Sequence, residues 1–278
     1  MSRTPPILRC CRGGFRVFIL RPSVSAQLES QLPAGTGQPL VSPIVSPAKS
    51  FPALKIAVPQ QPRVTRELTS LQALLGIGAY LSLGFPYLRR THGLDRLDTS
   101  KRYLFVCNHV SLLDTILLGG LCWRSGCYPI LVLGDKSVWH ASWIKRVLSS
   151  RIGFLLERGK LNPGRIRELQ EFGRAANEFH LVVFPEGTRG DGVRVGPCQP
   201  GLYYIAQEAR LAMVPVFFEN MQLVSTKTGR FHPIGGLRKV EVHFGAPISA
   251  ETYLQVPRED FPDFVRRSIA ATFPSRSS

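Results

Sequence analysis

Acidic residues are scarce in this 278-residue sequence, where 19 Asp and Glu stand against 35 Lys and Arg and give a net charge of +16 at pH 7. Such an excess predicts an acidic partner or surface, for example nucleic acid, anionic lipid, an acidic carrier protein or a phosphorylated substrate. The shortage is greatest in residues 1–66, where Glu29 is the single acid beside nine Lys and Arg. Half of the net charge therefore lies in this N-terminal arm.

Paired cysteines are also lacking. The six cysteines form no CxxC pair and show no zinc-site spacing, and a chain of this length needs no disulfide to build a core. We expect all six to be reduced. Cys107 lies in an apolar run two residues before a histidine, which admits a nucleophile, but a small buried hydrophobe is the commoner role of such a residue.

The first 66 residues have no sustained apolar periodicity. Prolines cluster from Pro33 to Pro62, so we expect a disordered, basic, Pro/Ser-rich arm that buries no core. Met1–Ala26 carries arginines and no acid, which is typical of a plastid or mitochondrial transit peptide. A plain basic tail and a misassigned start codon fit the same residues equally well.

Long apolar runs are absent except for one. Leu68–Leu88 contains 21 residues without a charge, close to the ~20 that cross a bilayer as a helix, and arginines flank both ends. We predict a membrane helix within residues 67–92 that spans the bilayer, re-enters it or lies flat on it. A buried core helix is the alternative, because the run contains Gln72, Ser82 and three glycines.

Residues 93–278 show short apolar runs that alternate with helix-like stretches, which predicts one α/β domain with a largely parallel sheet flanked by helices. The predicted strands are Tyr103–Cys107, Pro129–Leu133, Leu181–Phe184, Met213–Phe218 and Val240–Phe244, and the predicted helices are Ser111–Leu121, Ile144–Leu148, Pro163–Asn177 and Gly201–Arg210. Ligands of such sheets gather at the carboxyl ends of the strands, so the residues after each strand are the candidates for chemistry.

A histidine and a carboxylate, His109 and Asp114, follow the first predicted strand. On one continuous helix, five positions would place them about 140° apart. If the helix instead starts near Ser111, Asp114 lies in its first turn and can reach back to the imidazole as a His–Asp dyad. The spelling Ser111-x-x-Asp114 is equally that of a capping box, and the two roles are compatible. These two residues are poor metal ligands, since no further ligands follow at familiar spacing.

Two further segments carry arginine beside glycine. Pro185–Gly190 follows a predicted strand and holds Glu186, Thr188 and Arg189, of which arginine is suited to bidentate phosphate recognition. Gly153–Gly159 delivers Arg158 next to a glycine. A surface turn and an edge strand with solvated charges are the alternatives for the two segments.

Together these segments resemble the glycerolipid acyltransferases typified by lysophosphatidic acid acyltransferase. The family has an Asn-His-x4-Asp block, a Gly-Phe-x3-Arg-Gly-like block, a Phe-Pro-Glu-Gly-Thr-Arg block and a Val-Pro-Val block, in that order. The chain has Asn108–Asp114, Gly153–Gly159, Phe184–Arg189 and Val214–Val216. Four blocks in order are a specific signal, and they cover roughly residues 100–250. Gly190 departs from the pattern, because a serine is frequent there.

The resemblance implies that His109 is the general base for an acceptor hydroxyl that attacks an acyl thioester, and that Asp114 orients it. Arg158 and Arg189 would hold the acceptor phosphate. Glu186, Gly187 and Thr188 would shape the same pocket, with Lys136 as a further cationic candidate.

The acceptor implied is a lysophospholipid, with 1-acyl-glycerol 3-phosphate favoured, and the donor is acyl-CoA or acyl-carrier protein. Neither a metal nor a cofactor is implied. The enzyme would act at a membrane, on its cytoplasmic side or on the stromal or matrix side of an organelle. Glycerol 3-phosphate or another lysolipid is the alternative acceptor, and a non-catalytic lipid-binding relative is a further alternative. A basic nucleic-acid-binding protein is the rival from another class, but the sequence contains no recognisable module of that kind, so we predict no nucleic acid partner.

Overall fold

The computed structural model describes residues 70–140, 152–157, 159–228 and 230–273. Within these residues the chain forms one seven-stranded sheet of order β1-β7-β6-β2-β5-β3-β4. The strands are β1 Leu88–His92, β2 Tyr103–Cys107, β3 Ile130–Asp135, β4 Gly153–Leu156, β5 His180–Val183, β6 Ala212–Glu219 and β7 Val240–Phe244. The predicted arm over residues 1–66 lies outside the described residues.

The sheet is mostly parallel, as predicted. β6, β2, β5, β3 and β4 run in the same direction. β7 pairs antiparallel with β6, and β1 pairs parallel with β7. The carboxyl ends of five strands therefore meet at one edge of the sheet.

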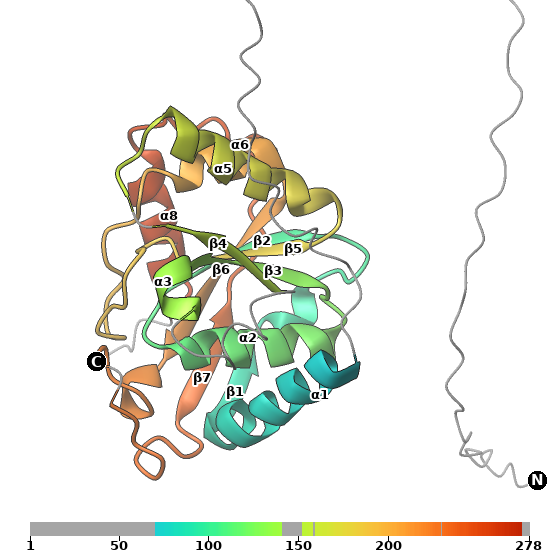
Figure 1. Ribbon diagram of the computed structural model, residues 1–278, viewed down its shortest axis with the longest axis vertical. Helices are drawn as coiled ribbons and strands as arrows, with labels where there is room; N and C mark the ends of the chain where they lie inside the picture. Colours follow the sequence, from blue (N-terminus) through green and yellow to red (C-terminus); the bar gives the residue numbers. More distant parts are fainter. Residues whose placement is uncertain (1–69, 141–151, 158, 229, 274–278) are drawn as a thin grey trace, which may run out of the picture. The chain divides into compact units, whose positions relative to one another are not determined.

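Helices cover both faces of the sheet, and Figure 1 shows α5 and α6 on the opposite side from α1 and α2. The α-helices are α1 Ser70–Ala79, α2 Leu112–Ser125, α3 Lys136–Trp139, α5 Pro163–Arg174, α6 Leu202–Ala209, α7 Ala250–Tyr253 and α8 Phe261–Ala270. Short 3-10 or π segments are Tyr80–Gly84, Phe85–Tyr87, Leu94–Arg96, Ala175–Asn177 and Met221–Leu223. The central strands are buried on both faces, which is why their sequences read as continuous apolar runs.

The predicted elements are largely present. Strands β2 and β7 have the predicted bounds, and the ends of helices α2, α5 and α6 lie within four residues of the predicted ends. The predicted helix Ile144–Leu148 lies outside the described residues. Strands β1 and β4 are not among the predicted strands, although an edge strand was the alternative for Gly153–Gly159, and helices α3, α7 and α8 are not among the predicted helices. Both strands are short edge strands, and β1 is largely exposed and polar, so it has no apolar pattern to reveal it.

The described part of the predicted membrane helix is helical from Ser70 to Tyr87, but Leu88–His92 is strand β1 of the sheet, so the predicted bounds of 67–92 extend too far at the C-terminal end. The segment packs on α2, because the Tyr80 ring fits against Gly120 so closely that no Cβ could be added there. The Tyr80 hydroxyl also accepts a hydrogen bond from Arg124, at 3.2 Å. Across the described part of the chain, no helix combines the length and the apolar content that a bilayer crossing requires.

Candidate functional site

The site lies where the carboxyl ends of β2 and β5 meet. These strands are parallel neighbours, so the loop after Cys107 and the loop after Val183 emerge side by side. A backbone hydrogen bond of 2.6 Å joins them, from the Gly190 amide to the His109 carbonyl oxygen. The first and third sequence blocks thus form one site.

His109 and Asp114 are in contact. His109 Nδ1 lies 2.9 Å from Asp114 Oδ2, and the Asp114 side chain is fully buried whereas that of His109 is 21% exposed. The helix begins after Ser111, so Asp114 lies in the first turn of α2 and reaches back to the imidazole. The predicted contact between the two residues is present.

Asp114 also caps α2. Its Oδ2 atom accepts hydrogen bonds from the backbone amides of Val110, at 2.6 Å, and Ser111, at 2.9 Å, while the Ser111 side chain accepts from Leu113. Both readings of the sequence therefore hold for the same carboxylate oxygen. The cap fixes the carboxylate, and the carboxylate in turn fixes the imidazole.

The His109 ring has one nitrogen left for chemistry. Since Nδ1 faces Asp114, the tautomer with a proton on Nδ1 leaves Nε2 as the basic nitrogen. The Phe184 ring packs on the imidazole with centroids 4.3 Å apart. The imidazole is thus held from two sides while part of it stays open to solvent.

Asn108, directly before His109, is bonded to β6, the other strand that neighbours β2. Its side-chain oxygen accepts from the Phe218 amide at 2.7 Å, and its side-chain nitrogen donates to the Phe218 carbonyl at 3.2 Å. Asn108 is buried. These two bonds anchor the start of the loop on β6, a role that the sequence did not assign to Asn108 although it begins the first block.

The buried Glu186 side chain joins the loop after β2 to the loop after β5. Its Oε1 accepts from the His109 amide and its Oε2 from the Gly196 amide, each at 3.1 Å. Burial raises the pKa of this carboxyl group above its ordinary value, and the two amide hydrogen bonds oppose that rise. A Cβ at Gly190 would lie 2.8 Å from Glu186 Oε2, which explains why glycine fits here.

Gly187, Thr188 and Arg189 form the outer part of the turn. Gly187 has a φ of 64°, a left-handed conformation that favours glycine. Thr188 is exposed and Arg189 is partly exposed. Within the described part of the chain, the Arg189 guanidinium has neither a hydrogen bond nor an ion pair, so it is available to an anion.

The other cationic residues predicted for the phosphate pocket are Lys136 and Arg158. Lys136 follows β3 at the same sheet edge, but its Nζ lies 3.2 Å from Glu157 Oε1 in an exposed ion pair. Arg158 lies outside the described residues.

The cysteines near the site are inert. The four that are described, Cys107, Cys122, Cys127 and Cys198, are free and buried. Burial raises the pKa of the Cys107 thiol well above its ordinary value, and that of Cys198 to about 12. A thiol so far from ionisation is a poor nucleophile, which leaves Cys107 a small core residue.

The chain is similar in sequence to known acyltransferases. Residues 89–219 match the family model described as Acyltransferase. The chain is similar to 1-acyl-sn-glycerol-3-phosphate acyltransferases of Saccharomyces cerevisiae, with 30% identity over 62% of this chain and 55% of the relative, and of Cocos nucifera, with 25% identity over 56% and 48%. The alpha form of Homo sapiens is 29% identical over 65% and 62%. The chain thus spans about half to two thirds of the length of these relatives.

The fold matches a solved structure. The crystal structure of the 1-acyl-sn-glycerophosphate (LPA) acyltransferase PlsC from Thermotoga maritima gives a TM-score of 0.52, covering 75% of this chain and 80% of that one. The sequence identity is 19%, so this likeness concerns the arrangement of helices and strands.

Proposed function

We propose that this protein, whose residues 89–219 match the Acyltransferase family model, transfers a fatty acyl group from a thioester to the free hydroxyl of 1-acyl-glycerol 3-phosphate, giving phosphatidic acid. The observation that carries the proposal is the buried Asp114 carboxylate 2.9 Å from Nδ1 of the partly exposed His109. The names of the relatives support the acceptor, since each is called a 1-acyl-sn-glycerol-3-phosphate acyltransferase.

The chemistry follows from the need to activate an alcohol. His109 Nε2 takes the proton of the acceptor hydroxyl as its oxygen attacks the thioester carbonyl carbon, a step to which a positioned imidazole contributes typically about 10²–10⁴-fold. Asp114 stabilises the imidazolium through Nδ1. The tetrahedral intermediate collapses, the C–S bond breaks, and the imidazolium returns its proton to the departing thiolate.

The same chemistry requires neither an acyl-enzyme nor a cofactor. A thioester is already an activated acyl group, and the acceptor supplies the nucleophile. The buried thiols are not needed for this sequence of steps. The donor would be acyl-CoA or acyl-carrier protein, both acidic and both complementary to a chain of net charge +16.

The acceptor phosphate would bind at the turn after β5. Arg189 has no partner among the described residues, and it follows the left-handed Gly187 by two positions in the turn. Glu186 holds this turn against the His109 loop, so one acceptor can place its phosphate at the turn and its hydroxyl at His109. Arg158 and Lys136 would add cationic charge, Lys136 after release from Glu157.

A membrane surface would supply the lipid substrates. The segment before the sheet leaves Leu74 and Leu81 more than half exposed, and Ile234 in the loop after β6 is 81% exposed. These two regions are adjacent, because the Arg238 amide donates to the Pro86 carbonyl at 3.0 Å. We propose that the predicted apolar segment and this loop lie in the lipid surface together, with the site on the cytoplasmic, stromal or matrix side.

The test is acyl incorporation by the purified full-length chain. Labelled acyl-CoA and acyl-carrier protein are offered separately with 1-acyl-glycerol 3-phosphate, glycerol 3-phosphate and lysolipids of other head groups. The proposal expects labelled phosphatidic acid as the main product. If another acceptor is labelled instead, that acceptor is the substrate. If the folded protein labels no acceptor with either donor, the proposed acyltransferase activity is contradicted.

A further inference from the structure

A second polar cluster lies on strands β1, β7 and β6, and its β6 member directly follows Phe218, on which Asn108 is anchored. The cluster consists of His92 on β1, Glu241 and His243 on β7, and Glu219 on β6. Pairing of the strands brings the side chains together, since His92 is the register partner of His243 and Glu241 is that of Glu219. Glu241 and His243 are two apart on one strand, so they share a face of the sheet.

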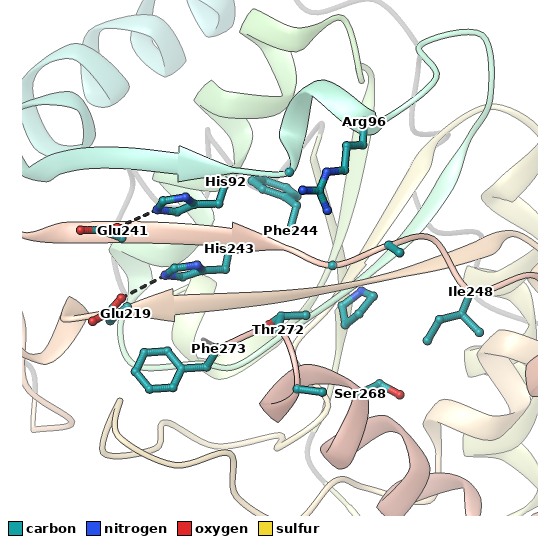
Figure 2. Close-up of a pocket in the computed structure, with 15 residues that line it drawn as sticks. His92, Arg96, Glu219, Glu241, His243, Phe244, Ile248, Ser268, Thr272 and Phe273 are labelled. Carbon is teal, nitrogen blue, oxygen red and sulfur yellow. Dashed lines mark hydrogen bonds and ion pairs between the residues drawn. The ribbon is translucent and has the colours of Figure 1, made fainter. Parts of the chain in front are cut away.

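The side chains are close enough to act as one unit. His92 Nε2 lies 2.7 Å from Glu241 Oε2, and His243 Nε2 lies 3.0 Å from Glu219 Oε2. The two imidazole rings are stacked, with centroids 4.5 Å apart and an interplanar angle of 6° (Figure 2). One ligand atom each of His92, Glu241 and His243 lies within 4.8 Å of the others.

The cluster is reachable from outside. It lines an open pocket of about 780 Å³, whose other walls include Arg96 and the residues that follow α8. Figure 2 shows both rings and both glutamates at one side of this pocket. An ion can therefore enter without unfolding of the sheet.

The backbone holds the cluster in place. Gly93, directly after His92, has a φ of 76° and passes so close to the Phe244 carbonyl oxygen that a Cβ would collide with it. The end of β1 is thus fixed against β7. His243 and Glu241 are largely buried, and the His243 ring packs edge-on against Phe273.

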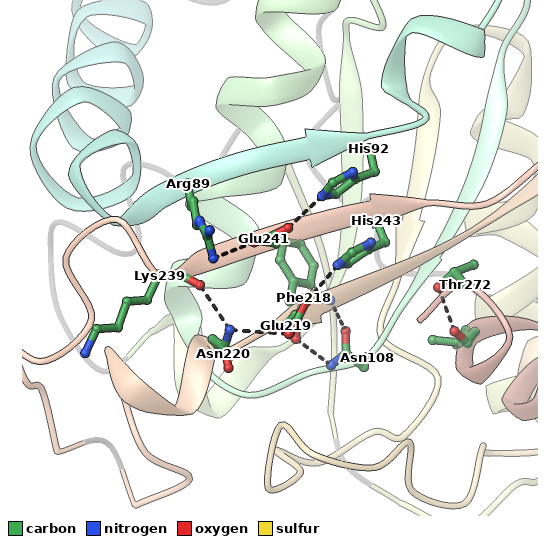
Figure 3. Close-up of polar contacts among 11 residues, drawn as sticks. Arg89, His92, Asn108, Phe218, Glu219, Asn220, Lys239, Glu241, His243 and Thr272 are labelled. Atoms are coloured by element: carbon green, nitrogen blue, oxygen red, sulfur yellow. Dashed lines mark hydrogen bonds and ion pairs between the residues drawn. The ribbon is translucent and has the colours of Figure 1, made fainter. Parts of the chain in front are cut away.

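The charges favour a cation. Two carboxylates stand at one register position of neighbouring strands, where like charges destabilise the pair unless a positive charge lies between them. Arg89 supplies part of that charge, since its Nη1 lies 3.2 Å from Glu241 Oε1 (Figure 3). That contact uses the Oε1 atom of Glu241, whereas Oε2 faces the imidazole.

We propose that His92, Glu241 and His243 bind a divalent transition-metal cation of the Zn²⁺ class, with Glu219 beside them as a fourth oxygen donor. Imidazole with carboxylate is a donor set that suits Zn²⁺, and imidazole is a poor ligand for Mg²⁺. On binding, the Nε2 protons are released to solvent and the metal takes their place. Since N–Zn distances are about 2.0–2.1 Å, the side chains draw together on binding, and the two nearly parallel rings tilt so that both Nε2 atoms face one ion.

The bound ion would have a structural effect. It ties edge strand β1 to β7, and β1 follows directly after the helical segment that packs on α2. An ion that binds the folded chain alone stabilises it by RT ln(1 + L/Kd), where L is the free ion concentration. The site takes no part in the acyl transfer proposed above, so each can fail without the other.

The test uses the full-length chain, purified without a histidine tag and freed of metal with a chelator. Titration with ZnCl₂ in a calorimeter should give one equivalent bound per chain and a rise in the melting temperature, and MgCl₂ should give neither. Co²⁺ should give visible absorption bands on binding.

Two variants and one control make the result specific. His92→Gln and Glu241→Gln should each weaken Zn²⁺ binding by about tenfold to a hundredfold or more. Both conserve size, and His92 is 42% exposed, so the fold should survive, as circular dichroism would check. The control His232→Gln replaces a histidine outside the cluster and should bind as the unaltered chain does. Equal binding by all four proteins, or no binding near one equivalent, would overturn the proposal.

Discussion

Replacing Asp114 by asparagine separates its two roles. The Asp114 Oδ2 atom takes three contacts, from His109 Nδ1 at 2.9 Å and from the amides of Val110 and Ser111 at 2.6 and 2.9 Å. An asparagine oxygen can still accept from the two amides, so the cap of α2 largely survives. It cannot stabilise an imidazolium with a full negative charge.

The expected loss of activity follows from that missing charge. A hydrogen bond to a charged group contributes about 1.5–3 kcal/mol, which corresponds to roughly tenfold to a hundredfold in rate. We expect kcat to fall by that factor in Asp114→Asn, and KM for the acceptor to change little. The free energy of unfolding should fall by about 1–3 kcal/mol, because the helix keeps its cap but the amide nitrogen takes the place of Asp114 Oδ1, which is buried without a hydrogen-bond partner among the described residues.

Ser111→Ala is the matched control. It removes the hydroxyl that accepts from the Leu113 amide at 3.1 Å and should cost about 1 kcal/mol of stability, but it leaves the Asp114 carboxylate on His109. Steady-state kinetics with acyl-CoA and 1-acyl-glycerol 3-phosphate give the activities, and urea unfolding gives the stabilities. If the two variants lose equal activity at equal stability, Asp114 is a helix cap and its catalytic role is refuted.

Three further predictions concern phosphate binding, the buried glutamate and the membrane. Arg189→Ala should lower kcat/KM for phosphate-bearing acceptors about tenfold to a hundredfold and spare basal thioester hydrolysis, whereas Arg194→Ala, an exposed arginine of the same loop, should change neither. Burial raises the pKa of Glu186 in the folded chain, so ionisation of this carboxyl group destabilises the fold. Relative to Glu186→Gln, the unaltered chain should therefore lose unfolding free energy as the pH rises above the ordinary pKa of 4.5. Urea unfolding at several pH values measures this difference. Membranes should retain the full-length chain at about 1 M salt, where the Debye length is roughly 3 Å, and release it in detergent; release by salt alone would exclude lipid burial of Leu68–Leu88.

The central sheet could be predicted from the sequence because its strands are buried on both faces. Strand β2 reads as an unbroken apolar run for that reason, and the residues after it were the natural place to look for chemistry. Edge strand β1 could not be predicted, since three of its five residues are exposed and polar or charged. The predicted membrane segment 67–92 therefore included this strand.

The candidate site was predictable where its residues are near one another in the chain. His109 and Asp114 are five positions apart, and the capping pattern gives the start of the helix that joins them. The clamp by Glu186 on the His109 amide joins residues 77 positions apart and could not be derived from spacing. The contact of His92 with Glu241 spans 149 positions and depends on a strand that has no sequence pattern.

The most direct test of the account is acyl transfer by His109→Ala. With labelled acyl-CoA and 1-acyl-glycerol 3-phosphate, the purified variant should form phosphatidic acid about 10²–10⁴-fold more slowly than the unaltered chain, because the general base is gone. Its circular dichroism and melting temperature should remain near those of the unaltered chain, since His109 is partly exposed. Turnover within a few-fold of normal by a folded variant would contradict the assignment of His109 as the base.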